Sequence, residues 1–448
     1  MTDVTPAPAG PVRRHTLVVD LGFGDAGKGA TVDRLCQGGG VAAVVRFNGG
    51  AQAAHNVVTS DGRHHTFAQF GSGTLRGVPT QLSRFTAVDP LALAAEADHL
   101  RALGVPDPYA LLGVDREAPL TTPYHAAANR LREQARGEGR HGSCGMGVGE
   151  TARYALAHRD DAPTAGDCAS RPRLLRRLRL LRDRLTDELG PLPAPPVEAC
   201  AEAYTAFARA VRLTDGTRLR QLAARGPLVF EGAQGVLLDE WHGFHPYTTW
   251  STTTFGNAET LLTEAGAAGE GLRLGVVRTY TTRHGPGPLV TEDPELNALL
   301  PEPHNGHGRW QGAFRVGHFD AVAHTYAAEV CGGVDALAVT HLDAPRRCRS
   351  LRICRAYGLD GALVERLPAG PPGDLARQAE LTGRMLRASP AVWDTPGRDP
   401  RRWSAAIGAL LGAPVMLESS GPARQRLRDP RSTGKSKYVP GKGSAVSV

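Results

Sequence analysis

The chain has 448 residues, of which 41% are hydrophobic, and it carries 52 Lys and Arg against 45 Asp and Glu. Its apolar residues never run long enough to span a membrane, and its seven scattered cysteines include no CxxC pair. These features argue against a membrane span, a disulfide framework and a cysteine zinc site, and they favour a cytoplasmic protein with reduced thiols. The net charge of +7 is spread along the chain, so we expect nucleotide-phosphate contacts rather than nucleic-acid binding.

Residues 1–15 predict a flexible N-terminus without a secretion signal. The first predicted strand, residues 17–20, leads into the turn Gly22-Phe23-Gly24-Asp25-Ala26-Gly27-Lys28-Gly29. Lys28 is the only lysine before position 435, in a chain that otherwise uses Arg. A strand, a glycine loop and a lysine form a common phosphate cradle.

The spacing of this turn is that of a Walker A motif, but Gly29 stands where Ser or Thr would bind magnesium. An ordinary Walker-type kinase is therefore disfavoured. Asp25 would repel phosphate unless it holds a divalent cation or abstracts a proton. The alternative is a glycine-rich turn with a solvated aspartate.

A second predicted strand, residues 41–47, leads into Asn48-Gly49-Gly50-Ala51-Gln52-Ala53-Ala54-His55. A lone histidine is usually structural, but its place one βα unit after the first loop favours a catalytic role. Residues 91–103 predict a helix. Residues 104–227 show little strand pattern and much Arg/Leu helix, including residues 199–212, and predict a helical insertion over the site.

A third polar segment follows the predicted strand at residues 228–231 and reads Glu231-Gly232-Ala233-Gln234-Gly235, with a hydroxyl-rich run at 248–252. Glu and Gln at a strand end suit hydrogen bonding to a base edge and orientation of a catalytic acid. A plain turn would explain the glycines but neither Gln234 nor the hydroxyl run.

Strands predicted at 272–280 and 336–340, and a helix at 319–330, complete an alternation of strands and helices. The pattern predicts an α/β fold with a mostly parallel central sheet, a P-loop-like phosphate loop and helical insertions. Its ligands are expected at the carboxyl ends of the strands. We predict a single α/β domain over 16–424 and a basic surface tail over 425–448.

In this order the segments resemble the adenylosuccinate synthetase family. That family reads GDEGKGK, RFxGGxNAGH, EGAQGxLLDxDxGTYPxVTSSN, TTRxGxGPxxTE, KLD and a final GP-containing loop. The counterparts here are residues 24–30, 46–55, 231–251, 281–292, 341–343 and 420–422, so the resemblance spans nearly the whole chain.

The resemblance implies a GTP- and Mg²⁺-dependent ligase that joins the 6-oxo carbon of IMP to the amine of aspartate. By resemblance, Asp25 is the base and a magnesium ligand, together with the backbone carbonyl of Ala54. His55 is the acid and Gln234 orients the base edge. Residues around GTP would be Gly24, Gly27, Lys28, Gly29, His341, Asp343, Ser420 and Gly421. Residues around IMP would be Gln52, Ser143, Cys144, Gln234, Thr249, Arg159 and Arg171.

The resemblance also implies a homodimer in which an arginine crosses to the partner's nucleotide, and Arg159 and Arg171 are both candidates. The chain departs from the family at Ala26, Ala30 and Ala54, and His341 replaces the lysine of KLD.

The largest departure lies where the family recognises aspartate. Here Arg309, Trp310 and Arg315 are the candidate contacts to the amine donor, and the pocket is more apolar than in the family. Two readings stay open: an ordinary aspartate-using enzyme, or one in which the amine donor or the lactam nucleotide has changed. A non-catalytic GTP-binding protein is a third, which would not need Asp25, His55 and Gln234 together.

Overall fold

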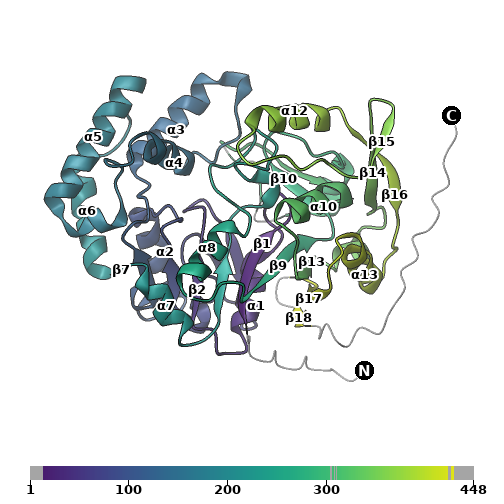
Figure 1. Ribbon diagram of the computed structural model, residues 1–448, viewed down its shortest axis with the longest axis horizontal. Helices are drawn as coiled ribbons and strands as arrows, with labels where there is room; N and C mark the ends of the chain where they lie inside the picture. The colour runs from purple at the N-terminus through teal and green to yellow at the C-terminus, as the bar shows by residue number, and fades with distance from the viewer. Residues whose placement is uncertain (1–13, 303–304, 307, 309, 422–424, 428–448) are drawn as a thin grey trace.

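The computed structural model describes residues 14–302, 305–306, 308, 310–421 and 425–427 (Figure 1). Ten strands form the central sheet, in the order β18-β17-β13-β9-β1-β8-β2-β5-β6-β7. Neighbouring strands are parallel except β17 and β18. The strands are β1 (His15–Asp20), β2 (Ala43–Arg46), β5 (Thr80–Leu82), β6 (Leu112–Asp115), β7 (Arg212–Thr214), β8 (Leu228–Glu231), β9 (Gly271–Arg278), β13 (Ala336–Thr340), β17 (Val415–Ser419) and β18 (Gln425–Leu427).

The central strands are buried because helices cover both faces of the sheet. Every residue of β1, β2, β8 and β13 is buried. Continuous apolar runs of this kind are typical of parallel strands covered on both faces. The predicted α/β class and mostly parallel sheet are confirmed.

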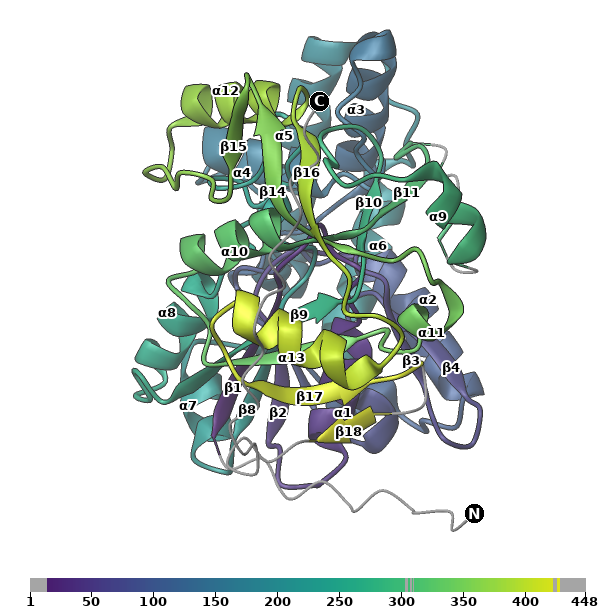
Figure 2. The same cartoon turned by 90° about the vertical axis from the view of Figure 1, so that its right-hand side faces the viewer.

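Three smaller sheets surround the carboxyl edge of the central sheet. They pair β3 (His55–Val58) with β4 (His64–Phe67), and β10 (Thr281–His284) with β11 (Phe314–Gly317). The third contains β12 (Phe319–Asp320), β14 (Ile353–Leu359), β15 (Ala362–Val364) and β16 (Ser389–Asp394). Figure 2 shows β10 and β11 above the central strands, beside β14 and β16.

The α-helices lie around the central sheet, and one group of them gathers at one end of the molecule. In Figure 1, α3 to α6 gather on the left and α12 lies on the upper right. The helices are α1 (Lys28–Cys36), α2 (Pro90–Ala102), α3 (Pro123–Ala135), α4 (Val148–Ala157), α5 (Arg171–Leu189), α6 (Val197–Ala210), α7 (Thr217–Ala223), α8 (Gly256–Glu264), α9 (Pro294–Leu299), α10 (Ala321–Val330), α11 (Ala344–Arg347), α12 (Leu375–Met385) and α13 (Pro400–Leu410). Among these described helices, none is both long and apolar enough to cross a bilayer.

Spacing in the sequence explains how the Arg-rich helix α5 packs. Leu174, Leu178, Leu181 and Leu185 recur every three or four residues and are all buried, so they form one apolar face. That face belongs to a core shared with α2, α3 and α6, while the arginines of α5 are exposed or half-buried. A second core joins the central sheet to α8, α10 and α13.

Several predicted boundaries differ from the structure. The stretch 104–227 contributes β6 and β7 to the central sheet besides its helices. The sequence did not predict these strands, because they are too short to give a clear pattern. The helix expected from residue 319 begins at Ala321, since the Asp320 side chain accepts a hydrogen bond from the Ala323 amide and caps it. Strand β1 already begins at His15, and residues 425–427 pair with β17; residues 1–13 and 428–448 lie outside the described part.

Candidate active site

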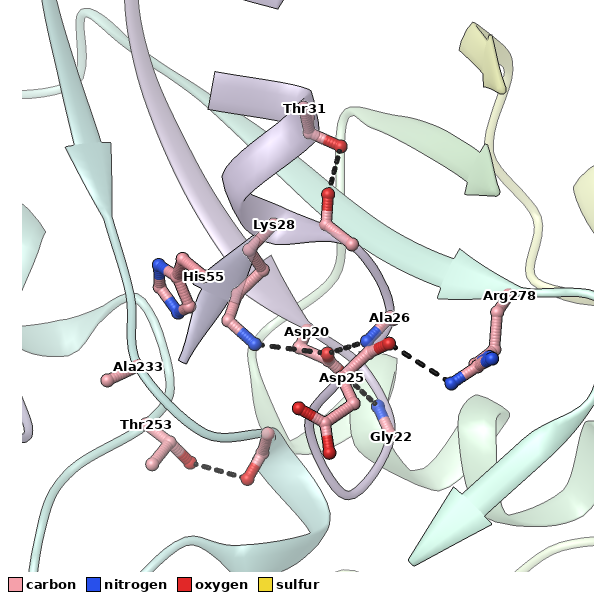
Figure 3. Close-up of polar contacts among 12 residues, drawn as sticks. Asp20, Gly22, Asp25, Ala26, Lys28, Thr31, His55, Ala233, Thr253 and Arg278 are labelled. Carbon is pink, nitrogen blue, oxygen red and sulfur yellow. Dashed lines mark hydrogen bonds and ion pairs between the residues drawn. The ribbon is translucent and has the colours of Figure 1, made fainter. Parts of the chain in front are cut away.

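The glycine-rich turn between β1 and α1 is shaped by Asp20, the last residue of β1. One carboxylate oxygen accepts from the Gly22 amide at 2.8 Å, and the other accepts from the Ala26 amide at 2.9 Å and from Lys28 Nζ at 3.1 Å (Figure 3). Gly27 has a φ of 95°, which favours glycine, and closes the turn into α1. The loop is therefore built around a buried Asp20–Lys28 ion pair.

Asp25 stands at the tip of this loop with a φ of 59°. Its carbonyl accepts from the Arg278 guanidinium at 3.2 Å, and its Oδ2 lies 3.4 Å from His284 Nε2. Burial alone would raise the pKa of the Asp25 carboxyl, but the hydrogen bond from His284 and the charges of His284, Lys28 and Arg278 hold it below its usual value. Asp25 is thus ionised at neutral pH, as both a base and a metal ligand require.

His55 opens β3 and is oriented by Glu231 from the end of β8. The two meet at 2.7 Å between Nδ1 and Oε1, and Glu231 also accepts from the amide and the hydroxyl of Ser72. Burial lowers the pKa of His55 to about 4, although Glu231 opposes the shift. The unliganded ring is therefore neutral, with its Nδ1 proton on the Glu231 side, which leaves Nε2 to act on a ligand.

Two cavities meet at these groups. The larger, of about 420 Å³, reaches the β8–α8 connection and the start of α4, and Gln52, Ser143, Cys144, Gln234 and Thr249 are among its lining residues. The smaller, of about 190 Å³, runs past Gly27 and Gly29 toward His341, Ser419 and Gly421. Both are lined by five common residues, Asp25, Lys28, Ala54, His55 and Asn305. A group transferred between two bound molecules would cross at this junction.

Three buried side-chain oxygens of the ligand-binding residues expected from the sequence have no hydrogen-bond partner among the described residues. They are Oε1 of Gln52 and of Gln234 in the larger cavity, and Oδ1 of Asp343 beyond the smaller one. Buried polar atoms are rarely left unpaired, so these oxygens indicate ligand contacts. The other carboxylate oxygen of Asp343 lies 3.0 Å from Arg347.

The magnesium ion that the sequence implies fits this arrangement. Mg²⁺ keeps waters and substrate phosphates in its shell and takes only one or two protein ligands. Asp25 and Ala54 both line the junction of the two cavities. The residues present would therefore hold the ion against bound phosphates, where it would neutralise phosphate charge.

Comparisons with known proteins agree with the resemblance found in the sequence. A family model described as adenylosuccinate synthetase matches residues 17–427. The adenylosuccinate synthetase of Alkalilimnicola ehrlichii is 34% identical over 431 residues, covering 92% of this chain and 97% of its own. That of Acidithiobacillus ferrooxidans is 35% identical over 436 residues, covering 92% and 98%. The chain belongs to the adenylosuccinate synthetase family.

Solved structures agree on the fold. The fully ligated adenylosuccinate synthetase of Plasmodium falciparum superposes with a TM-score of 0.79 at 19% identity, covering 93% of this chain and all of that one. A cyanophage S-2L succinoaminodeoxyadenylate synthetase bound to dGMP and dATP gives 0.57 at 18% identity, covering 92% and 94%. As a member of the adenylosuccinate synthetase family, this chain is a GTP- and Mg²⁺-dependent carbon–nitrogen ligase.

The structure brings most of the expected family residues together and leaves a few apart. Neither Arg159 nor Arg171 lines the two cavities; Arg159 is exposed after α4, and Arg171 begins α5 beside a separate groove. Ser420 is exposed next to Gly421, which lines the smaller cavity. His341 lies in that cavity with a φ of 54°, and burial holds its pKa well below the usual value, so it does not replace the charge of the family lysine.

The residues expected to contact the amine donor are placed less simply. Arg315 donates to the Gly285 and Gly287 carbonyls at 3.0 and 2.8 Å, and to Glu292 at 2.9 Å. Trp310 lies against Gly145, where an added Cβ would come within 2.8 Å of its ring. Arg309 lies outside the described residues.

Sequence reasoning assigned no site role to Asp20, Arg278 or His284, whereas it gave Glu231 the orientation of a catalytic acid, and Glu231 does contact His55. An acidic residue closing a buried apolar strand was a signal for Asp20 and for Glu231. Arg278 and His284 gave no local signal, because their partners lie far away in the chain. Arginines of α3 and α4 also line the larger cavity, paired with acidic neighbours: Arg132 with Glu150, Arg136 with Glu133 and Arg153 with Glu188.

Proposed function

We propose that this enzyme phosphorylates the 6-oxo group of IMP, or of an IMP-like lactam nucleotide, with GTP. It then displaces phosphate with the amine of L-aspartate to give an N-succinyl adduct, GDP and phosphate. The observation that carries the proposal is the pair of cavities that share Asp25, Lys28, Ala54 and His55. In this assignment the lactam nucleotide occupies the larger cavity and GTP the smaller one.

The chemistry follows from the positions of these side chains. Asp25 accepts the proton from the lactam N–H, and the electron pair moves to the exocyclic oxygen, which attacks the γ-phosphorus as the bond to GDP breaks. Lys28 and the loop amides stabilise the phosphate charge. That charge favours the protonated form of His55, which then donates to the transferring group. The donor amine attacks C6, phosphate leaves, and the amine proton goes to solvent.

Selection of GTP is assigned to Asp343. Its buried Oδ1 has no partner in the described residues, which suits acceptance of the N1–H and N2–H donors of guanine. Asp343→Asn should lower kcat/KM for GTP by about 100-fold and reduce the preference for GTP over ATP, because one acceptor oxygen of the side chain is replaced by an NH₂ donor. The control Asp360→Asn changes an exposed carboxylate and should leave both values unchanged. An unchanged GTP preference in Asp343→Asn would remove this assignment.

A second candidate replaces aspartate by another amine. It is favoured by Arg315, whose guanidinium already makes four hydrogen bonds to Glu292 and two carbonyls, so it lacks the paired N–H groups for a bidentate contact to a substrate carboxylate. A screen of amines with IMP, GTP and Mg²⁺, read as phosphate release, distinguishes the two. Saturable phosphate release with aspartate, at full turnover, supports aspartate as the donor. No phosphate release with aspartate, but turnover with another amine, supports the second candidate.

A non-catalytic GTP-binding protein is tested by the same assay. In a catalyst, Asp25→Asn and His55→Asn should each abolish phosphate release while GTP binding persists. No phosphate release from the unaltered protein, with any lactam nucleotide or amine, would favour the binding protein.

We also propose a homodimer in which Arg159 or Arg171 reaches the partner's lactam nucleotide, since neither lines the cavities of its own chain. The variant of the arginine that crosses the interface should be inactive alone, as should Asp25→Asn. Mixing Asp25→Asn with the correct arginine variant in equal amounts should restore up to about a quarter of the activity, because half of randomly formed dimers are mixed and each of these has one intact site of two. No restoration with either variant would exclude a shared site.

A further inference from the structure

His284 links the hairpin of β10 and β11 to the phosphate loop. It is the last residue of β10, directly opposite Phe314 of β11, and its Nε2 lies 3.4 Å from Asp25 Oδ2. It lines the larger cavity and is about 24% exposed. The family pattern TTRxGxGP leaves this position open, so membership of the family gives His284 no role.

The backbone around His284 is held firmly. Arg283 is buried, donates to the carbonyls of Pro286 and Pro288 at 2.9 Å each, and stacks 4.4 Å from the centre of the Phe23 ring. On the other side, Gly285 has a φ of 71° and an added Cβ would meet the Gln311 carbonyl at 2.4 Å. The histidine therefore stands on a rigid frame.

The imidazole ring itself is also held. It packs edge to face against Phe314, with the ring centres 4.7 Å apart. Asn305 lines the same cavity as the ring. The frame and these neighbours fix the ring in its position beside Asp25 before any substrate binds.

The Asp25 carboxylate has few other restraints. Within the described part of the chain, His284 is the single side chain in ion-pair or hydrogen-bond range of it, since Lys28 Nζ is bound to Asp20. The Asp25 side chain is about 29% exposed. Without His284 the carboxylate would be free to change rotamer.

We propose that His284 is a positioning residue that holds the Asp25 carboxylate in one orientation, so that the base is in place when the lactam nucleotide binds. The proposal rests on the proposed function, in which Asp25 takes the lactam proton. Loss of alignment of a reacting group costs rate rather than affinity. Removing His284 should therefore affect the phosphoryl-transfer step and leave the affinity for the amine donor unchanged.

The test compares His284→Leu, which removes the hydrogen bond, with His284→Gln, which keeps a donor of similar reach. The first readout is isotope exchange in GTP labelled with ¹⁸O at the β,γ-bridging position, with IMP and Mg²⁺ but no amine donor. Scrambling of the label requires reversible transfer of the γ-phosphoryl group to the lactam, and the donor plays no part. The second readout is the KM for the amine donor, and the third is the midpoint of thermal unfolding.

We expect His284→Leu to slow exchange and kcat about 10- to 100-fold with donor KM and unfolding midpoint unchanged. His284→Gln should restore most of the rate. His158→Leu, at the end of α4 and outside both cavities, is the control and should behave as the unaltered enzyme.

Three outcomes would overturn the inference. Normal exchange in His284→Leu would show that Asp25 needs no support. Normal exchange with a raised donor KM would make His284 a donor contact instead. His284 would be a structural residue if the loss of rate in His284→Leu came with a lower unfolding midpoint and His284→Gln did not restore the rate. If the unaltered enzyme shows no exchange and no turnover, the proposed function fails instead.

Discussion

Lys28 Nζ lies 3.1 Å from Asp20 Oδ2, and both side chains are almost completely buried. The lysine that the sequence presents as a phosphate ligand is therefore already paired in the absence of phosphate. Asp20 also accepts hydrogen bonds from the amides of Gly22 and Ala26. The ion pair therefore fixes both the shape of the loop and the position of the positive charge of Lys28. Lys28 therefore has two roles, in the stability of the loop and in phosphate binding. Because the pair is buried, a single substitution of Lys28 would disturb both at once.

Substitution of Lys28 should therefore be read as a double-variant experiment. Lys28→Met leaves Asp20 charged and unpaired, which should cost about 3–5 kcal/mol of folding free energy and abolish GTP binding. Adding Asp20→Asn removes the uncompensated charge and should recover much of that stability but none of the GTP affinity. Chemical denaturation and titration calorimetry measure the two effects, and recovery of GTP binding in the double variant would contradict a direct role for Lys28.

Glu231 orients His55 across 176 residues of sequence. Glu231→Gln keeps the size of the side chain, but an amide cannot accept from His55 and from both Ser72 donors at once. We expect kcat to fall about 10- to 100-fold with little change in KM for GTP. Glu264→Gln, which alters an exposed ion pair with Arg84, is the control. An unchanged kcat in Glu231→Gln would reduce Glu231 to a structural residue.

The phosphate loop could be predicted from the sequence because its chemistry is local: a buried strand, glycines and a lysine within a dozen residues. The same holds for Asp25, His55 and Gln234, each of which follows a strand of one parallel sheet and so arrives at one edge. The hydrogen-bond partners of Arg315 could not be predicted in this way, because they depend on the pairing of β10 with β11.

Gly235 shows how closely two of these segments approach. An added Cβ would lie 2.2 Å from the Gly22 carbonyl oxygen and 2.3 Å from the Gly24 amide nitrogen, both backbone atoms of the phosphate loop. Gly235→Ala should therefore displace the loop, lowering stability by about 1–3 kcal/mol and weakening GTP binding. The control Gly216→Ala has open space around its Cβ and a φ of −58°, and should be neutral or slightly stabilising. Normal GTP affinity in Gly235→Ala would mean that the loop tolerates displacement.

His125 gives a pH dependence of stability that is separate from catalysis. It is buried at the start of α3, where its Nδ1 accepts from the Thr122 amide at 3.2 Å, and burial lowers its pKa from 6.5 to about 3. Because the unfolded chain binds the proton more tightly, stability is full above pH 6.5 and is lost as the pH falls toward 3. At pH 5 this histidine alone should cost about 2 kcal/mol relative to pH 7.5.

The substitution His125→Gln isolates this effect, because glutamine at this position completes the same capping box with Thr122 but does not titrate. Denaturant unfolding at pH 7.5 and pH 5 should show a smaller acid loss in the variant than in the unaltered protein, by about 2 kcal/mol. Other buried histidines titrate in both proteins and cancel in the comparison. Equal acid losses would mean that His125 is already protonated in the folded state, or that the unfolded chain also keeps it neutral.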